Sequence, residues 1–147
     1  MEIGSKINKI YTLEYLTTEP ENKYFDRKAA AIKPSDIARH ISAFANADGG
    51  VIAIGIEDKS KEITGINPYG EDKINKFINV PRIHCKPMPD YQEEFIDVTN
   101  NQGKSDRILL LHIKKSTEQI IRTDNDSTWL ADRRLFRRNE RRQSAKS

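Results

Sequence analysis

Basic side chains occur in four short groups along the body of the chain, and such groups commonly contact phosphate oxygens. The groups are Arg27 and Lys28; Arg39 and His40; Arg82, His84 and Lys86; Lys114 and Lys115. If the fold brings two groups to one face, they form a track for the backbone of a nucleic acid. If it does not, they are scattered solubilising charges, and the sequence favours neither alternative.

Other kinds of site lack the residues that they need. Gly49-Gly50 and Gly55 are not followed by Lys-Ser or Lys-Thr, so a P-loop for ATP hydrolysis is absent. The three histidines have no partner at metal-ligand spacing, and a single cysteine cannot complete a zinc site. No motif marks a Ser-His-Asp or Cys-His set. His40 is expected to face solvent or to pack at the edge of its helix.

Residues 37–58 are the stretch around which the chain is organised. Ile37, Ile41 and Phe44 recur at helical spacing, so one stripe of a helix faces a core. Gly49-Gly50 ends this helix, because glycine adopts a positive φ without a Cβ penalty. The apolar run at residues 51–56 suits a central strand that is buried on both faces. We predict that Ile52 and Ile54 lie on one face and Val51, Ala53 and Ile56 on the other.

The sequence AFANADGG, followed by an apolar strand, by GIED and by ITGI at residues 63–66, resembles the Schlafen AlbA-type DNA-binding domain of bacterial regulators and Schlafen proteins. Its motif residues are Asn46, Gly49, Gly50 and Gly55. The segment ENKYFDRK at residues 21–28 is similar to the opening of the same pattern. The resemblance covers roughly residues 19–122 and implies an α+β architecture. Near residue 130 the chain departs from the family, because the usual arginine-glycine pattern is missing.

Glu21, Asp26 and Asp58 occupy the positions that carry a three-carboxylate metal site in nuclease members of this family, which cut transfer RNA-like substrates. The resemblance therefore implies a Mg²⁺ or Mn²⁺ site, with Lys28 at the scissile phosphate. Such a site requires that strands at residues 23–29 and 51–56 lie side by side as antiparallel neighbours.

These carboxylates also have a purely structural interpretation. Glu21 would lie in a solvated turn, Asp26 would pair with a neighbouring Arg or Lys, and Asp58 would accept backbone amides in a hairpin turn. Asp26 stands where nuclease members have glutamate, and its shorter side chain holds its oxygens further from a shared metal. Both interpretations remain open from the sequence.

The remaining segments complete a mixed order of helices and strands. Helices are predicted at residues 6–16 and 71–80, the latter ended by Pro81; residues 83–90 read as extended or irregular chain, and strands at residues 92–98 and 107–114 form an antiparallel hairpin. This order predicts an α+β fold, a single domain with a mixed or antiparallel sheet and two to three helices packed on it. We assign residues 1–18 to an N-terminal helix and linker, 19–131 to the Schlafen AlbA-type domain, and 132–147 to a basic tail.

Positive charge is concentrated in the tail. Residues 133–147 hold six Arg and one Lys against one Glu, a net +6, so the formal +3 of the whole chain leaves −3 for residues 1–132. The tail arginines, which include Arg133, Arg134, Arg137 and Arg138, could neutralise phosphates without reading sequence. Alternatively, the tail is simply disordered and solvated, and the sequence does not favour phosphate binding over this alternative.

Targeting signals are absent from the sequence. No apolar run approaches the roughly 18 residues of a membrane span, and the first residues lack the apolar run of a signal peptide. Cys85 is the only cysteine, which excludes an internal disulfide and agrees with a reducing cytosol. We expect a cytoplasmic protein without a membrane partner.

These features predict a domain that binds DNA or RNA mainly through phosphate contacts, as a regulator or a defence-related module. The expected contact residues are Arg27, Lys28, Arg39, Lys114, Lys115, Arg133, Arg134, Arg137 and Arg138. One alternative is a metal-dependent endoribonuclease acting on tRNA-like RNA, and another is a dimerisation module without nucleic acid. Schlafen proteins place two related lobes in one chain, so the single lobe here predicts a homodimer.

Overall fold

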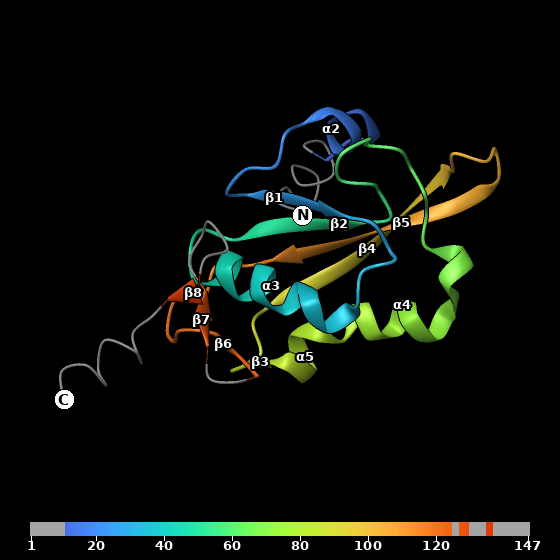
Figure 1. Ribbon diagram of the computed structural model, residues 1–147. Helices are drawn as coiled ribbons and strands as arrows, with labels where there is room; N and C mark the ends of the chain where they lie inside the picture. Colours follow the sequence, from blue (N-terminus) through green and yellow to red (C-terminus); the bar gives the residue numbers. More distant parts are fainter. Residues whose placement is uncertain (1–10, 125–126, 130–134, 137–147) are drawn as a thin grey trace.

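The computed structural model describes residues 11–124, 127–129 and 135–136 (Figure 1). Arg133, Arg134, Arg137 and Arg138 lie outside the described residues. The elements within them are, in chain order, α2 (Leu13–Thr18), β1 (Phe25–Lys28), the 3-10 helix η1 (Pro34–Ile37), α3 (Ala38–Ala45), β2 (Gly50–Ile54), the 3-10 helix η2 (Asn67–Tyr69), α4 (Gly70–Ile78), α5 (Val80–His84), β3 (Cys85–Lys86), β4 (Tyr91–Thr99), β5 (Ser105–Ile113), β6 (Arg122–Thr123), β7 (Thr128–Trp129) and β8 (Leu135–Phe136).

The main sheet has the strand order β1-β2-β5-β4. β5 is antiparallel to both β2 and β4. The pairing of β4 with β5 confirms the antiparallel hairpin that the sequence predicted. β1 runs parallel to β2, with Phe25 opposite Val51 and Lys28 opposite Ile54. The sheet is therefore mixed, and the fold is α+β as predicted.

The antiparallel arrangement that we predicted for β1 and β2 is wrong. Between the two strands the chain crosses one face of the sheet as α3 and returns to the end at which β1 began (Figure 1). A crossover of this kind joins parallel strands, whereas antiparallel neighbours can be joined by a short turn at one end of the pair. As a result, the turn before β1 and the turn after β2 lie at opposite ends of the strand pair.

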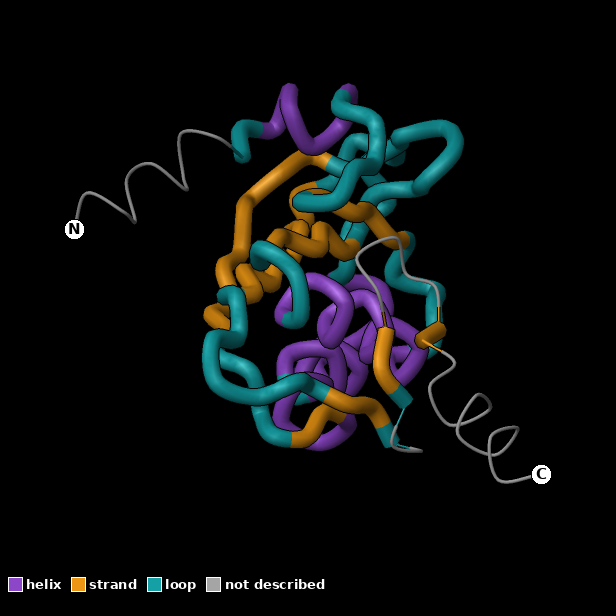
Figure 2. Tube along the Cα trace, turned by 90° about the vertical axis from the view of Figure 1, so that its left-hand side faces the viewer, coloured by secondary structure: helices purple, strands orange, loops and turns teal. Residues whose placement is uncertain are grey.

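Strand β2 separates two hydrophobic cores. Ile52 and Ile54 belong to the larger core, which α3 and α4 cover, and Val51, Ala53 and Ile56 belong to the smaller core, which α2 covers. The tube in Figure 2 shows α2 on one side of the sheet and the other helices on the opposite side. All five side chains are buried, which confirms the predicted alternation.

The turn between α3 and β2 depends on glycine. Gly49 has a φ of 84°, as predicted, and its N–H donates to the Phe44 carbonyl at 2.8 Å. A Cβ at this position would lie only 2.8 Å from the Ile113 carbonyl oxygen. Glycine is therefore needed here for two reasons: it adopts the left-handed backbone without strain, and it leaves room for the close approach of β5.

Several local predictions differ from the structure. Pro81 does not end the helical region, because after Asn79 it occupies the first turn of α5, where a missing N–H costs no hydrogen bond. Residues 80–84 are thus helical, although part of this segment was expected to be extended or irregular. The motif segment at residues 63–66 contributes only an isolated bridge between Ile56 and Ile63. A second sheet, with the order β3-β6-β7-β8, was not predicted. None of the described helices has the length and apolar character that a membrane crossing requires.

Candidate functional site

A buried polar cluster centres on Asp26 of β1. Strand alternation turns Asp26 and Lys28 toward α3, while Phe25 packs in the core beneath α2. Asp26 is 1% exposed, and its Oδ2 lies 2.8 Å from Nδ1 of His40 on α3. The Lys28 ammonium lies 3.6 Å from the Asp26 Oδ1. Of the two positions expected for His40, solvent exposure is wrong: the residue is 5% exposed, because it lies three residues after Ile37 and four before Phe44, on the buried stripe of its helix.

The charges of this cluster follow from burial and hydrogen bonding. Burial disfavours the charged form of Asp26, but hydrogen bonds with His40 and Glu21 and the charge of Lys28 outweigh it, so its pKa lies well below the usual range. Burial lowers the pKa of His40, more than the Asp26 carboxylate raises it. A neutral His40 that donates from Nδ1 to Asp26 also fits its Nε2, which accepts from Arg39 Nε at 3.3 Å.

Glu21 precedes β1 and folds back along its edge. Its Oε2 accepts the Arg27 N–H at 3.1 Å, which satisfies an edge donor of the sheet. Although Glu21 as a residue is exposed, partial desolvation of its carboxyl group, together with the hydrogen bond and negative charge of Asp26, raises its pKa to about 8. Near neutral pH the two carboxyl groups therefore hold one proton between them.

Asp58 does not join this pair. It lies in an exposed turn after β2, in a segment that passes on the α2 side of the sheet (Figure 1), whereas Asp26 faces α3. In the part of the chain that the structure describes, no three His, Cys, Asp or Glu side chains are grouped so as to hold a metal ion. Glu21, Asp26 and Asp58 as placed do not fit the three-carboxylate Mg²⁺ or Mn²⁺ site that the resemblance implied.

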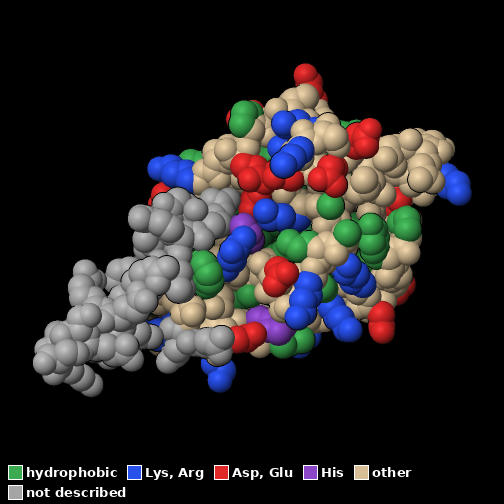
Figure 3. Space-filling model, in the orientation of Figure 1, with side chains coloured by type: hydrophobic (Ala, Val, Ile, Leu, Met, Phe, Trp, Pro, Cys, Tyr) green, Lys and Arg blue, Asp and Glu red, His purple; other side chains and the backbone are tan. Residues whose placement is uncertain are grey.

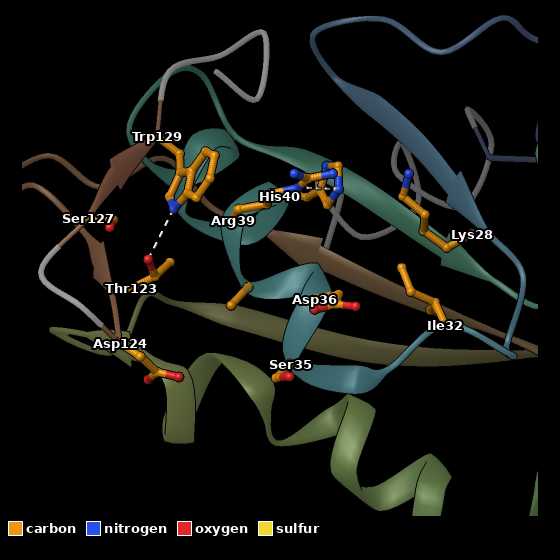
Figure 4. A pocket seen from close by; sticks show the side chains of 11 residues that line it. Lys28, Ile32, Ser35, Asp36, Arg39, His40, Thr123, Asp124, Ser127 and Trp129 are labelled. Carbon is orange, nitrogen blue, oxygen red and sulfur yellow. Dashed lines mark hydrogen bonds between the residues drawn. The ribbon is translucent and has the colours of Figure 1, made fainter. Parts of the chain in front are cut away.

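A pocket of about 530 Å³ opens beside the cluster. β1, η1 and α3 form one wall and the strands of the second sheet form the other (Figure 4). The lining residues are Lys28, Ile32, Ser35, Asp36, Ala38, Arg39, His40, Thr123, Asp124, Ser127 and Trp129. Lys, Arg and His side chains gather near the middle of the same face (Figure 3). The pocket thus combines two cations, several hydroxyl groups, two carboxylates and an indole ring.

The wall opposite α3 is held in place by contacts over long sequence separations. Asn46, a residue of the predicted motif, donates to the Ile121 carbonyl at 2.9 Å and accepts the Ile121 N–H at 2.7 Å. The Trp129 indole N–H donates to Thr123 Oγ1 at 3.0 Å, and the Arg39 guanidinium lies 5.7 Å from the indole centroid. The end of α3 therefore fixes the second sheet and positions Trp129 over the pocket.

The other predicted contact residues lie elsewhere. Arg27 is 1% exposed, and its guanidinium donates to the carbonyls of Leu16 at 3.0 Å and of Glu19. It therefore ties β1 to the end of α2 and is not available to a phosphate. Lys114 and Lys115 follow β5 and are exposed, with the Lys115 ammonium 3.8 Å from Asp48.

Sequence reasoning missed the roles of His40 and Trp129. The helical spacing of His40 with Ile37 and Phe44 was a usable signal. No comparable signal marked Trp129, because the two-residue strand that carries it is too short to show a period.

Comparison with known proteins agrees with this architecture. A crystal structure of the DIP2311 protein from Corynebacterium diphtheriae superposes with a TM-score of 0.54 at 16% sequence identity. The match covers 86% of this chain but only 25% of that one, so the chain spans about a quarter of the length of this relative. The family profile described as Schlafen, AlbA_2 matches residues 21–146. The chain therefore belongs to the Schlafen AlbA_2 family.

Proposed function

We propose that the protein binds nucleic acid, chiefly through phosphate contacts, on the face that holds the pocket. The observation that carries this proposal is that Lys28 of β1 and Arg39 of α3 line the same pocket. Two cations from separate elements beside one concave surface provide the paired donors with which proteins hold a phosphodiester. Membership of the Schlafen AlbA_2 family supports the same function.

Both cations keep N–H donors for such a contact beside the partners that they already have. Arg39 is exposed, and its guanidinium carries five N–H donors, of which His40 accepts one. The Lys28 ammonium has three donors, and the Asp26 carboxylate lies on only one side of it. The slight acidic excess of residues 1–132 makes a local site more plausible than a uniformly basic surface.

Binding of fluorescein-labelled single-stranded and duplex oligonucleotides, followed by anisotropy, tests this proposal. Lys28→Ala and Arg39→Ala are each expected to lower affinity about three- to tenfold, and to reduce the slope of log K against log salt by about 0.7 for a single strand. Lys104→Ala is the matched control, since Lys104 is an exposed lysine in the β4–β5 turn, away from the pocket. Equal affinities for all three variants and the wild type would exclude the pocket face as the binding site.

Metal-dependent endoribonuclease activity is a second candidate, and it would have to use Glu21 and Asp26 without Asp58, because among the described residues no three such side chains are grouped to hold a metal ion. Glu21 and Asp26 interact directly beside Lys28, which lines the pocket. Incubation of transfer RNA with and without Mn²⁺, followed by gel analysis of wild type and Glu21→Gln, tests this candidate. Mn²⁺-dependent cleavage that Glu21→Gln removes would support it, and intact RNA under conditions of full binding would leave binding alone.

A further inference from the structure

Trp129 gives the pocket a feature that phosphate binding does not require. The ring is half-buried and is fixed by its hydrogen bond to Thr123 at 3.0 Å. In Figure 4 it lies across the pocket from Lys28, with Arg39 and His40 between them. An indole held in this way is a platform on which a nucleobase can stack, and every base has a π-face for it.

The size of the pocket limits what can reach that platform. A volume of about 530 Å³ lies within the range of about 300–1,000 Å³ that is typical for small-ligand sites. A base inside a duplex is stacked on both faces and cannot enter, whereas an unpaired base can be turned out of its strand. The pocket therefore suits one nucleotide unit rather than a helix.

The polar groups of the pocket are arranged to suit the parts of such a unit. Arg39 covers the indole at 5.7 Å, and its exposed guanidinium can turn toward Lys28 and give the ring face to a base. Asp36 is a carboxylate on the lining, so a phosphate is favoured near Lys28 and Arg39 and disfavoured near Asp36. The hydroxyl groups of Ser35 and Ser127 are further hydrogen-bonding groups for sugar or base.

We propose that this pocket holds a single unpaired nucleotide, with its base stacked on Trp129 and its phosphate between Lys28 and Arg39. This inference rests on the proposed function and specifies its ligand. The protein then prefers single strands, strand ends or unpaired bases to continuous duplex.

The chain offers a direct probe, because Trp129 is its only tryptophan. A base that stacks on the ring should quench its fluorescence saturably, whereas ribose 5-phosphate should not. The titration uses adenosine 5′-monophosphate and a single-stranded hexanucleotide as separate probes. If both probes quench the fluorescence, the pocket also binds a free mononucleotide. If only the hexanucleotide does, the pocket binds a nucleotide only within a strand. The absence of quenching by either probe would overturn the inference.

A second measurement separates this inference from the proposed function. The ratio of single-strand to duplex affinity, measured by anisotropy, should fall about tenfold in Trp129→Ala and much less in Trp129→Phe, which keeps a ring for stacking. An unchanged ratio in a Trp129→Ala variant that unfolds at the wild-type temperature would overturn the inference while leaving phosphate binding intact. If the wild type binds no oligonucleotide, or if Lys28→Ala binds with the same affinity as the wild type, the result would instead count against the proposed function.

Discussion

Asp26 is a charged carboxyl group with 1% of its surface exposed, and its partners keep it charged. The Nδ1–H of His40 donates to the Asp26 Oδ2 at 2.8 Å. Removing a partner from a buried charged group costs about 1–3 kcal/mol or more, because the group loses its hydrogen bond without regaining water. His40→Ala should therefore lower the free energy of unfolding by at least about 1 kcal/mol in urea titration.

His40→Asn provides the matched control, because the asparagine amide can place a donor close to the position of the histidine Nδ1. It should recover part of the stability that His40→Ala loses. Equal stability of wild type and His40→Ala would mean that water or another side chain replaces the contact at no cost, which would contradict the account of the cluster.

Glu21 should make stability depend on pH in the opposite sense to Asp26. Desolvation and the neighbouring Asp26 raise its pKa to about 8, so between pH of about 4.5 and 8 the folded protein binds more protons than the unfolded chain. The free energy of unfolding contributed by Glu21 therefore falls as pH rises through that window. Glu21→Gln should flatten this decline in urea titrations at several pH values, and a profile identical to wild type would be inconsistent with the shared proton.

Asp26 has its effect at acid pH. Its folded-state pKa is depressed, so its contribution is present above the ordinary aspartate pKa of about 3.9 and is lost as pH falls below it. The two carboxyl groups can thus be told apart by the pH range in which a variant differs from wild type.

The junction of α3 and β2 can be tested by adding a single methyl group. Gly49→Ala strains a φ of 84° and places Cβ 2.8 Å from the Ile113 carbonyl oxygen, so it should cost about 1–3 kcal/mol for the backbone and more for the clash. Gly103→Ala is the control, since Gly103 has a φ of 76° but open space where a Cβ would lie. Urea titration should show Gly49→Ala as the less stable variant, and the reverse order would contradict the packing of β2 on β5.

Elements with a clear local pattern were predictable from the sequence. The β2 alternation, the spacing of Ile41 and Phe44 in α3, and the hairpin with its glycine-containing turn are each visible in one continuous segment of the sequence. The direction of β1 was not visible, because it depends on how residues 29–49 cross the sheet. The second sheet consists of two-residue strands, which show no period, and its anchor joins Asn46 to Ile121 across 75 residues.

The same distinction explains the outcome for the site. Lys28 and Arg39 were identified by residue type, and the structure places both on one pocket. Arg27 has the same charge, but it lies next to Lys28 on the strand and its side chain therefore points to the opposite face of the sheet, into the interior beneath α2. Asp58 could be grouped with Glu21 only through the family resemblance, and the parallel pairing of β1 with β2 separates them.

On the scale of the whole molecule, the basic segment 133–147 is expected to act without sequence preference. It carries a net +6. Deletion of residues 137–147 removes four Arg and one Lys against one Glu and leaves β8 paired with β7, so it should lower affinity by a similar factor for all oligonucleotides and flatten the salt dependence. The preference for single strands should remain in the shortened protein, because it belongs to the pocket. A deletion that removes this preference but spares total affinity would contradict the division of roles.

The homodimer that the single lobe predicts can be tested by measuring the molecular mass of the protein in solution. Light scattering over a range of concentrations should give about twice the 16.9 kDa of the chain. A mass of one chain throughout would show that the binding face acts in a monomer.

The most direct test of the binding face is a ¹H–¹⁵N titration of the full chain with an unlabelled single-stranded oligonucleotide. The largest shift changes should fall on the backbone amides of Lys28 and Arg39 and on the indole N–H of Trp129, which gives one signal because the chain has one tryptophan. Amides of the β4–β5 turn, including Lys104, should not move. Changes confined to residues 133–147, or to Lys114 and Lys115, with the Trp129 indole signal unmoved, would contradict the pocket face as the site.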